Sequence, residues 1–131
     1  MKYTVVLLGG VLSLTWAAAV LASDKVYAAS VIDLLTFPER YEGRVIRIKG
    51  FLDTSSGINL FFTRDHAQIR DFESSIQVSD DEELCIVQSL CGGQYVELVG
   101  TFVGRNKIEH SIVEVSRIRK VADQEYCYEK D

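Results

Sequence analysis

Three residues at alternating positions, Arg47, Lys49 and Phe51, are of the types that bind an anionic or flat ligand. They belong to the stretch GRVIRIKGFL, residues 43–52, in which mostly aliphatic residues fill the intervening positions. Side chains alternate between the two faces of a strand, so we expect Ile46, Ile48 and Leu52 in the core. The other three would then share the outer face, where a cation beside an exposed ring suits a ligand that is part anionic and part apolar.

A second stretch, INLFFTR at residues 58–64, brings further residues to the same face. Its alternation predicts a strand with Ile58, Leu60 and Phe62 inward and Phe61 outward. The candidate ligand-binding residues are therefore Arg47, Lys49, Phe51, Phe61 and Arg64. Aromatic rings that stack bases beside basic residues are typical of single-stranded nucleic-acid binding, but the net charge of −5 disfavours a grip on polyphosphate. A protein, peptide or glycan ligand fits the same patch, and so does a solvated strand face without a ligand.

No arrangement of residues indicates catalysis, a metal ion or a cofactor. The acidic run Asp80–Glu83 fits the first turn of a helix, where carboxylates stabilise the positive end of the dipole. A calcium loop would instead space its oxygen ligands at alternate positions around a glycine. Neither His66 nor His110 has a nucleophile or a metal-spaced partner beside it in the sequence. We therefore expect a protein without enzymatic activity.

The N-terminal segment predicts export. One lysine precedes an uncharged run from Tyr3 to Ala22, and polar residues follow. This is the pattern of a signal peptide cleaved after Ala22, although the run is almost long enough to be a retained membrane anchor. The expected division is a signal peptide at 1–22, a domain at 23–122 and a charged tail at 123–131. The exported protein would be periplasmic or secreted and would not contact the membrane after cleavage.

Three cysteines, Cys85, Cys91 and Cys127, follow the predicted signal peptide. In an oxidising compartment such cysteines tend to pair, and an odd number leaves one thiol over. Cys85 and Cys91 are badly spaced for a bridge within one helix. The candidates are therefore Cys91–Cys127 or Cys85–Cys127, either of which would tie the tail to the domain. The alternative is three unpaired thiols.

The expected elements follow the order β-β-β-α-β-β after a short helix. They are a helix from Ser30 stopped by Pro38, strands at 43–52, 58–64 and 75–79, a helix at 79–91, and strands at 93–102 and 109–121. The second helix should face the core with Leu84, Val87, Leu90 and Cys91. This is the order of the OB-fold, a five-stranded Greek-key barrel, rather than another meander or sandwich. Gly50 and Gly100 take the same inward phase in two strands that must bend sharply, where a side chain would collide with the core.

Several stretches also resemble a known family. LLTFPERYEGRVIRIKGFL, NLFFTRD, SIQVS and GGQYVELVGTF are similar to segments of small exported bacterial OB-fold proteins, which are mostly uncharacterised. The likeness covers about Ser30 to Val121 and implies the fold and export, but no catalytic motif. We therefore expect an exported OB-fold binding or interaction module whose ligand the sequence does not identify. The alternative is an oligonucleotide-binding OB-fold protein outside the cytoplasm.

Overall fold

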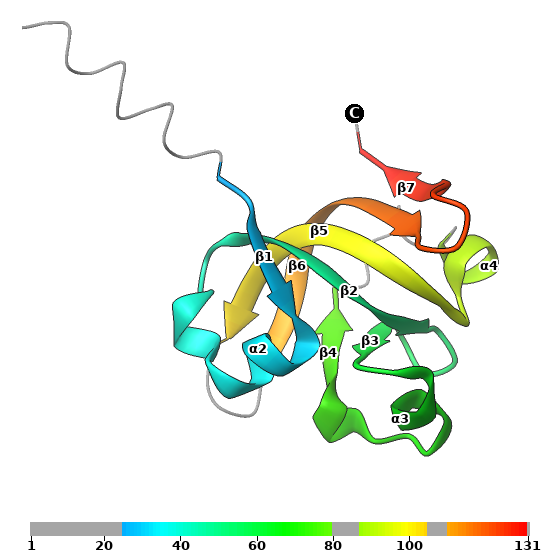
Figure 1. Ribbon diagram of the computed structural model, residues 1–131, viewed down its shortest axis with the longest axis horizontal. Coiled ribbons are helices and arrows are strands. Elements are labelled where there is room, and N and C mark those ends of the chain that lie inside the picture. The colour runs from blue at the N-terminus through cyan, green and yellow to red at the C-terminus, as the bar shows by residue number, and fades with distance from the viewer. Residues whose placement is uncertain (1–24, 80–86, 105–109, 131) are drawn as a thin grey trace, which may run out of the picture.

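Five strands close into a barrel in the computed structural model, which describes residues 25–79, 87–104 and 110–130. The strands are β2 (Val45–Asp53), β3 (Asn59–Phe61), β4 (Ser75–Val78), β5 (Gln94–Gly104) and β6 (His110–Lys120). Going round the barrel, β2 pairs with β3, β3 with β4, β4 with β6, and β6 with β5. The pairing of β5 with β2 closes the barrel (Figure 1). Only β4 and β6 run parallel within this ring. The mainly-β, OB-fold-like barrel is thereby confirmed.

The core of the barrel is formed by the inward residues of these strands. The alternation read from the sequence holds in β2, where Ile46, Ile48 and Leu52 are fully buried. It holds equally in β5, where the inward positions Val96, Leu98 and Phe102 are fully buried. Apolar residues at every second position therefore hold the barrel together from within.

Gly50 and Gly100 lie where the barrel wall is too tight for a side chain. A Cβ atom at Gly50 would lie 2.7 Å from the carbonyl oxygen of Phe61 and 2.8 Å from Cγ of Leu60. At Gly100 it would lie 2.6 Å from Cγ2 of Ile112, beside a shift in the β5–β6 register. These contacts are shorter than any side chain tolerates, so both strands need a glycine to bend at these points.

An additional strand and helix precede the barrel. β1 (Tyr27–Ser30) runs parallel to β2, and the sequence had not indicated this strand. α2 (Val31–Thr36) follows at once, because the Ser30 hydroxyl accepts from the Asp33 N–H and the Asp33 carboxylate accepts from the Ser30 N–H. This capping box confirms the expected helix start. The 3-10 turn η3 (Pro38–Arg40) then leads towards β2.

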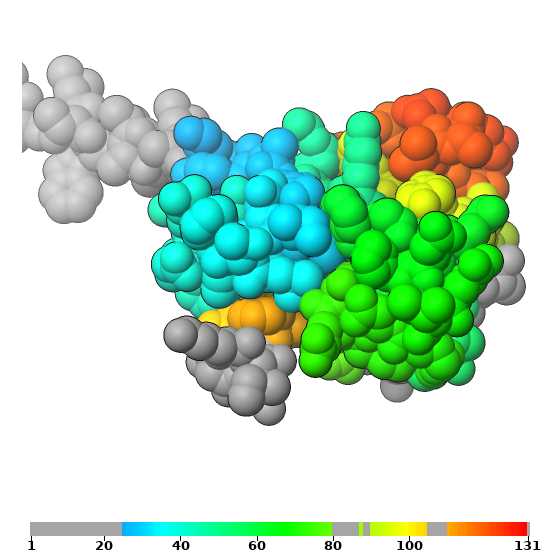
Figure 2. All heavy atoms as spheres, turned by 60° about the horizontal axis from the view of Figure 1, so that its bottom comes forward, coloured from blue at the N-terminus to red at the C-terminus, as the bar shows by residue number. Residues whose placement is uncertain are grey.

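The segment between β3 and β4 folds into two short helical pieces. α3 (Arg64–Gln68) begins at Thr63, whose hydroxyl accepts from the His66 N–H, and the 3-10 turn η4 (Phe72–Ser74) precedes β4. The sequence predicted a loop or a weak helical turn here. In Figure 2 the green part of the chain, which includes this segment, forms a continuous surface beside the cyan part that includes α2.

The helix between β4 and β5 is described only as α4 (Val87–Cys91). Its predicted acidic first turn, Asp80–Glu83, and the predicted inward residue Leu84 lie within 80–86, outside the described residues. Val87 and Cys91 are buried as expected. The inward assignment of Leu90 is wrong, because this side chain is 49% exposed.

The tail carries a strand and a disulfide. β7 (Tyr126–Glu129) pairs antiparallel with β6, although only a charged tail was expected at 123–131. Cys91 and Cys127 form the disulfide pair, with their Cα atoms 6.0 Å apart, which joins α4 to β7 and selects one of the two bridges left open above. Among the described residues, no helix is long and apolar enough to span a bilayer.

Candidate ligand-binding face

Arg47 and Lys49 lie on the outer face of β2, and both are exposed. Strand register fixes their neighbours, because Ala28 of β1 lies beside Arg47 and Ser30 lies beside Lys49. On the other side, β5 places Val99 beside Arg47 and Glu97 beside Lys49. The two cations therefore lie between a strand with small side chains and a strand with one acid.

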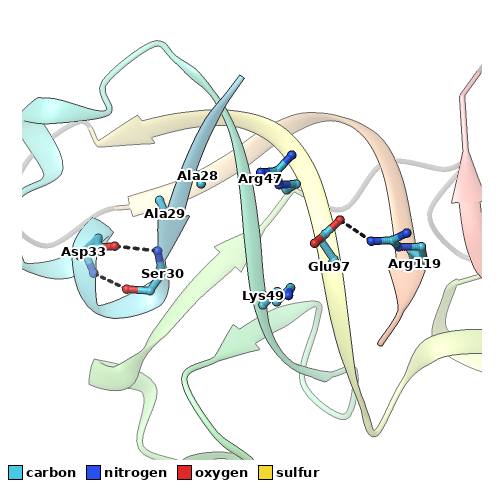
Figure 3. Close-up of a pocket in the computed structure, with 8 residues that line it drawn as sticks. All are labelled: Ala28, Ala29, Ser30, Asp33, Arg47, Lys49, Glu97 and Arg119. Atoms are coloured by element: carbon cyan, nitrogen blue, oxygen red, sulfur yellow. Dashed lines mark hydrogen bonds and ion pairs between the residues drawn. The ribbon is translucent and has the colours of Figure 1, made fainter. Parts of the chain in front are cut away.

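Arg47 and Lys49 line a surface depression of about 590 Å³. Figure 3 shows Arg47 and Lys49 on β2, with β1 on one side and Glu97 and Arg119 on the other. Among the described residues, the lining consists of Ala28, Ala29, Ser30, Asp33, Arg47, Lys49, Glu97 and Arg119. We call this feature the β1–β2 depression.

The acids of the depression already have partners. Glu97 accepts from the Arg119 guanidinium at 2.9 Å, and the Asp33 carboxylate accepts from the Ser30 N–H at 2.9 Å. In the part of the chain that the structure describes, neither Arg47 nor Lys49 forms an ion pair. The depression thus presents two cations at i and i+2 on one strand, while the carboxylates around them are engaged.

The expected exposure of Phe51 and Phe61 is wrong. Phe51 is 7% exposed and Phe61 is fully buried. They are cross-strand partners on the outer face of the barrel, and with Ala67 they form a small apolar cluster of their own. The Phe72 ring lies 5.5 Å from the Phe61 ring, centroid to centroid. Both side chains point outward from the barrel as predicted, but α3 and η4 cover this end of the outer face.

Arg64 belongs to the covered end rather than to the depression. Its guanidinium lies 5.5 Å from the Phe51 ring centroid, and its backbone N–H donates to the Tyr95 hydroxyl at 3.0 Å. The Tyr95 ring also meets the Phe51 ring edge-on at 5.3 Å. The five candidate residues therefore separate into two groups. Arg47 and Lys49 lie together in the open. Phe51 and Phe61 are covered by α3 and η4, and the exposed Arg64, the first residue of α3, lies over the Phe51 ring.

The inward assignment of Phe62 is also wrong. This ring is 40% exposed and packs edge-on against the His66 ring at 5.8 Å. The physical reason is that β3 ends at Phe61, so the alternation read across 58–64 does not reach Phe62. Ile58 and Leu60 are buried as expected.

The two histidines lie in separate places. His66 lies in the first turn of α3 with its Nδ1 2.6 Å from the hydroxyl of the cap residue Thr63, and His110 stacks on the Phe102 ring at 5.8 Å. Among the described residues, histidine, cysteine and acidic side chains form no group of three or more that would hold a metal ion.

Glu97 and Arg119 were missed as site residues, although the sequence held a signal for both. Glu97 sits at an outward position between Val96 and Leu98, and Arg119 follows the inward Ile118. What the sequence could not show was that β2, β5 and β6 are consecutive neighbours in this barrel.

The closed five-stranded barrel places the fold in the class of OB-fold-like barrels. Comparison with protein-family models, with curated proteins and with solved structures finds no match to this chain.

Proposed function

We propose that this protein is an exported, non-enzymatic binding module that holds an anionic ligand over Arg47 and Lys49. One observation carries the proposal. Two exposed cations at i and i+2 of one strand face an open depression, while the acids around them are engaged elsewhere. Like charges on the same strand face repel one another, and a bound anion would relieve that repulsion.

The proposed compartment is the periplasm or the extracellular space. The Cys91–Cys127 pair supports an oxidising environment, because such bridges persist outside the reducing cytosol. The predicted signal peptide at 1–22 and the resemblance to small exported OB-fold proteins point the same way.

Oligonucleotide binding is the weaker alternative. Sequence-tolerant binding of single strands needs aromatic rings on which bases stack. Phe51 and Phe61 were the candidates for that role, and both are buried beneath α3 and η4. The cations that remain open would attract a phosphate backbone but would supply no stacking platform.

An NMR titration tests the proposed function. Isotope-labelled protein would be titrated at low salt with three probes: an oligoglutamate peptide, a sulfated oligosaccharide and a single-stranded oligonucleotide. We expect at least one probe to shift the backbone signals of residues 28–30 and 47–49. Lys49→Ala should weaken this response, whereas Lys130→Ala, which removes the same charge beyond β7, should not.

The proposed function is wrong if no probe moves those signals, or if the two lysine variants behave alike. An oligonucleotide response centred on β3 and β4 would favour the alternative. Because exposed charges are screened over about 8 Å at physiological ionic strength, the expected response weakens as salt is added.

A further inference from the structure

β1 lies beside the depression and has an open edge. It pairs with β2 on one side, and no other strand of the described residues pairs with it on the other. In such an edge strand, alternate residues direct their backbone N–H and C=O groups away from the neighbour. The Ser30 N–H already donates to the Asp33 carboxylate in the capping box of α2, so an added strand would pair with the residues of β1 that precede Ser30. An edge of this kind can accept a further strand from a binding partner.

The side chains between that edge and the cations are small. On the outer face β1 presents Ala28 and Ser30, which lie in register with Arg47 and Lys49. A strand added to β1 would lie about 10 Å from β2, two strand spacings away. Because Ala28 and Ser30 are small, they leave room above β1. Long acidic side chains of the added strand can therefore reach the side chains of Arg47 and Lys49.

The spacing of the cations fits an extended peptide. Arg47 and Lys49 are two residues apart on a strand, a separation of about 7 Å. Acidic residues at i and i+2 of an extended peptide have the same separation and share one face. Two further cations lie at the start of β1, because the Lys25 ammonium and the Arg44 guanidinium lie 4.9 and 4.7 Å from the Tyr27 ring centroid.

We propose that the edge of β1 takes an acidic peptide segment as an added strand, with carboxylates at alternate positions over Arg47 and Lys49. This inference rests on the proposed function, since it requires these two residues to bind an anion. It adds the class of ligand, an extended acidic segment of another protein, and the backbone groups that hold it.

A peptide fits this surface better than a polyanion laid across the strands. A nucleic acid or sulfated glycan running from β2 to β6 would reach Arg117 and Arg119, but it would cross Glu97 of β5 on the way. A peptide at β1 stays on the side of Arg47 and Lys49 away from Glu97. It also uses backbone hydrogen-bonding groups that neither of the other ligands can pair with.

Peptide binding tests the backbone part of the inference. The probe is a short, capped peptide in which glutamate alternates with valine, and its matched control has the same composition with the glutamates in one block. Two further versions carry N-methyl groups, one on every glutamate and the other on every valine. Each methylated peptide keeps its charge but loses the backbone N–H donors along one of its two edges. We expect the alternating peptide to bind about tenfold more tightly than the block peptide, and only one methylated version to lose binding.

Protein variants test the side-chain part. Arg47→Ala/Lys49→Ala should weaken the alternating peptide about tenfold, because two exposed ion pairs are lost. Ala28→Glu should weaken it similarly, since the new carboxylate lies beside Arg47 and repels the peptide. Arg117→Ala is the control. It removes an exposed cation of the same face from β6, beyond β5, so the affinity for the peptide should change less than about twofold.

Three results would overturn the inference: equal affinity for the alternating and block peptides, loss of binding in both or neither of the methylated versions, or a loss in Arg117→Ala as large as in Arg47→Ala/Lys49→Ala. If anionic probes still shift the signals of residues 47–49, only the peptide inference fails and the proposed function stands. If they do not, both fail together.

Discussion

The outer face of β2 has two ends whose side chains point to the same side of the strand but lie in different environments. Arg47 and Lys49 at the first end are open, whereas Phe51 at the second is 7% exposed. The difference comes from what lies above each end. β1 contributes only Ala28 and Ser30 beside the cations, whereas α3 and η4 cover the rings. Strand periodicity assigns a side chain to a face, but a distant segment decides whether that face meets solvent.

The comparison also separates binding from stability. Burial of an aromatic side chain contributes about 1.5–3 kcal/mol, so Phe51 and Phe61 belong to what holds the fold together. Arg47 and Lys49 are exposed and without ion pairs among the described residues, so they contribute little to stability. Substitutions at the two ends should therefore have opposite consequences.

The largest effect should follow truncation at the covered end. Phe61→Ala should lower the free energy of unfolding by about 3–5 kcal/mol, because it opens a cavity between β3, α3 and η4. Phe62→Ala is the adjacent control. Its ring is 40% exposed, and the loss should stay below about 1 kcal/mol. Denaturant titrations of both proteins measure the difference, and similar losses would mean that the rings are not packed as described.

The second largest effect on stability should follow loss of the disulfide between α4 and β7. It closes a sequence separation of 36 residues and fixes β7 against β6 beside Arg119. Replacing both cysteines, as Cys91→Ser/Cys127→Ser, should cost about 2–4 kcal/mol. The unfolding midpoint of the wild-type protein should fall under reducing conditions, while that of the double variant should not. A wild-type midpoint that ignores reductant would contradict this bridge.

The two glycine bends should come third. Gly50→Val and Gly100→Val should each cost about 1–3 kcal/mol, since the new side chain meets backbone and core atoms at 3.0 Å or less. Gly50→Val should act on the covered end, because its Cβ meets Leu60 and Phe61 of β3. Unchanged denaturation midpoints in both variants would show that the barrel does not bend at these residues.

The smallest effect on stability is expected at the open end. Arg47→Ala and Lys49→Ala should each change the free energy of unfolding by less than about 0.5 kcal/mol, as surface substitutions usually do. A loss comparable to that of Phe61→Ala would mean that these cations are structural. In that case their role would be to stabilise the fold rather than to bind a ligand.

Sequence periodicity was enough to predict the barrel and the inward residues. Ile46, Ile48, Leu52 and the two glycines lie in strongly alternating strands. In such a strand, a shift of the register by one residue would move every inward side chain to the outer face. It was not enough at the ends of elements. β3 stops at Phe61, one residue before the alternation does, and Leu90 occupies the last turn of a short helix.

The candidate site was predicted only in part, for a reason of the same kind. Arg47 and Lys49 follow from local alternation and lie in the depression as neighbours. The cover over Phe51 is built from residues 64–74, a polar stretch with no apolar period that would have indicated packing. β1 could not be read from its four residues alone, because Tyr27–Ser30 gains its structure by pairing with β2.

The most direct test of this account compares Lys49→Ala with Phe51→Ala, two positions of one strand face. For each variant, the denaturation midpoint and the affinity for the alternating glutamate–valine peptide would be measured. We expect Lys49→Ala to keep its stability and lose affinity. We expect Phe51→Ala to lose stability and, while folded, to bind as the wild-type protein does. A folded Phe51→Ala that no longer binds, beside a Lys49→Ala that binds normally, would contradict the assignment of binding to the open end.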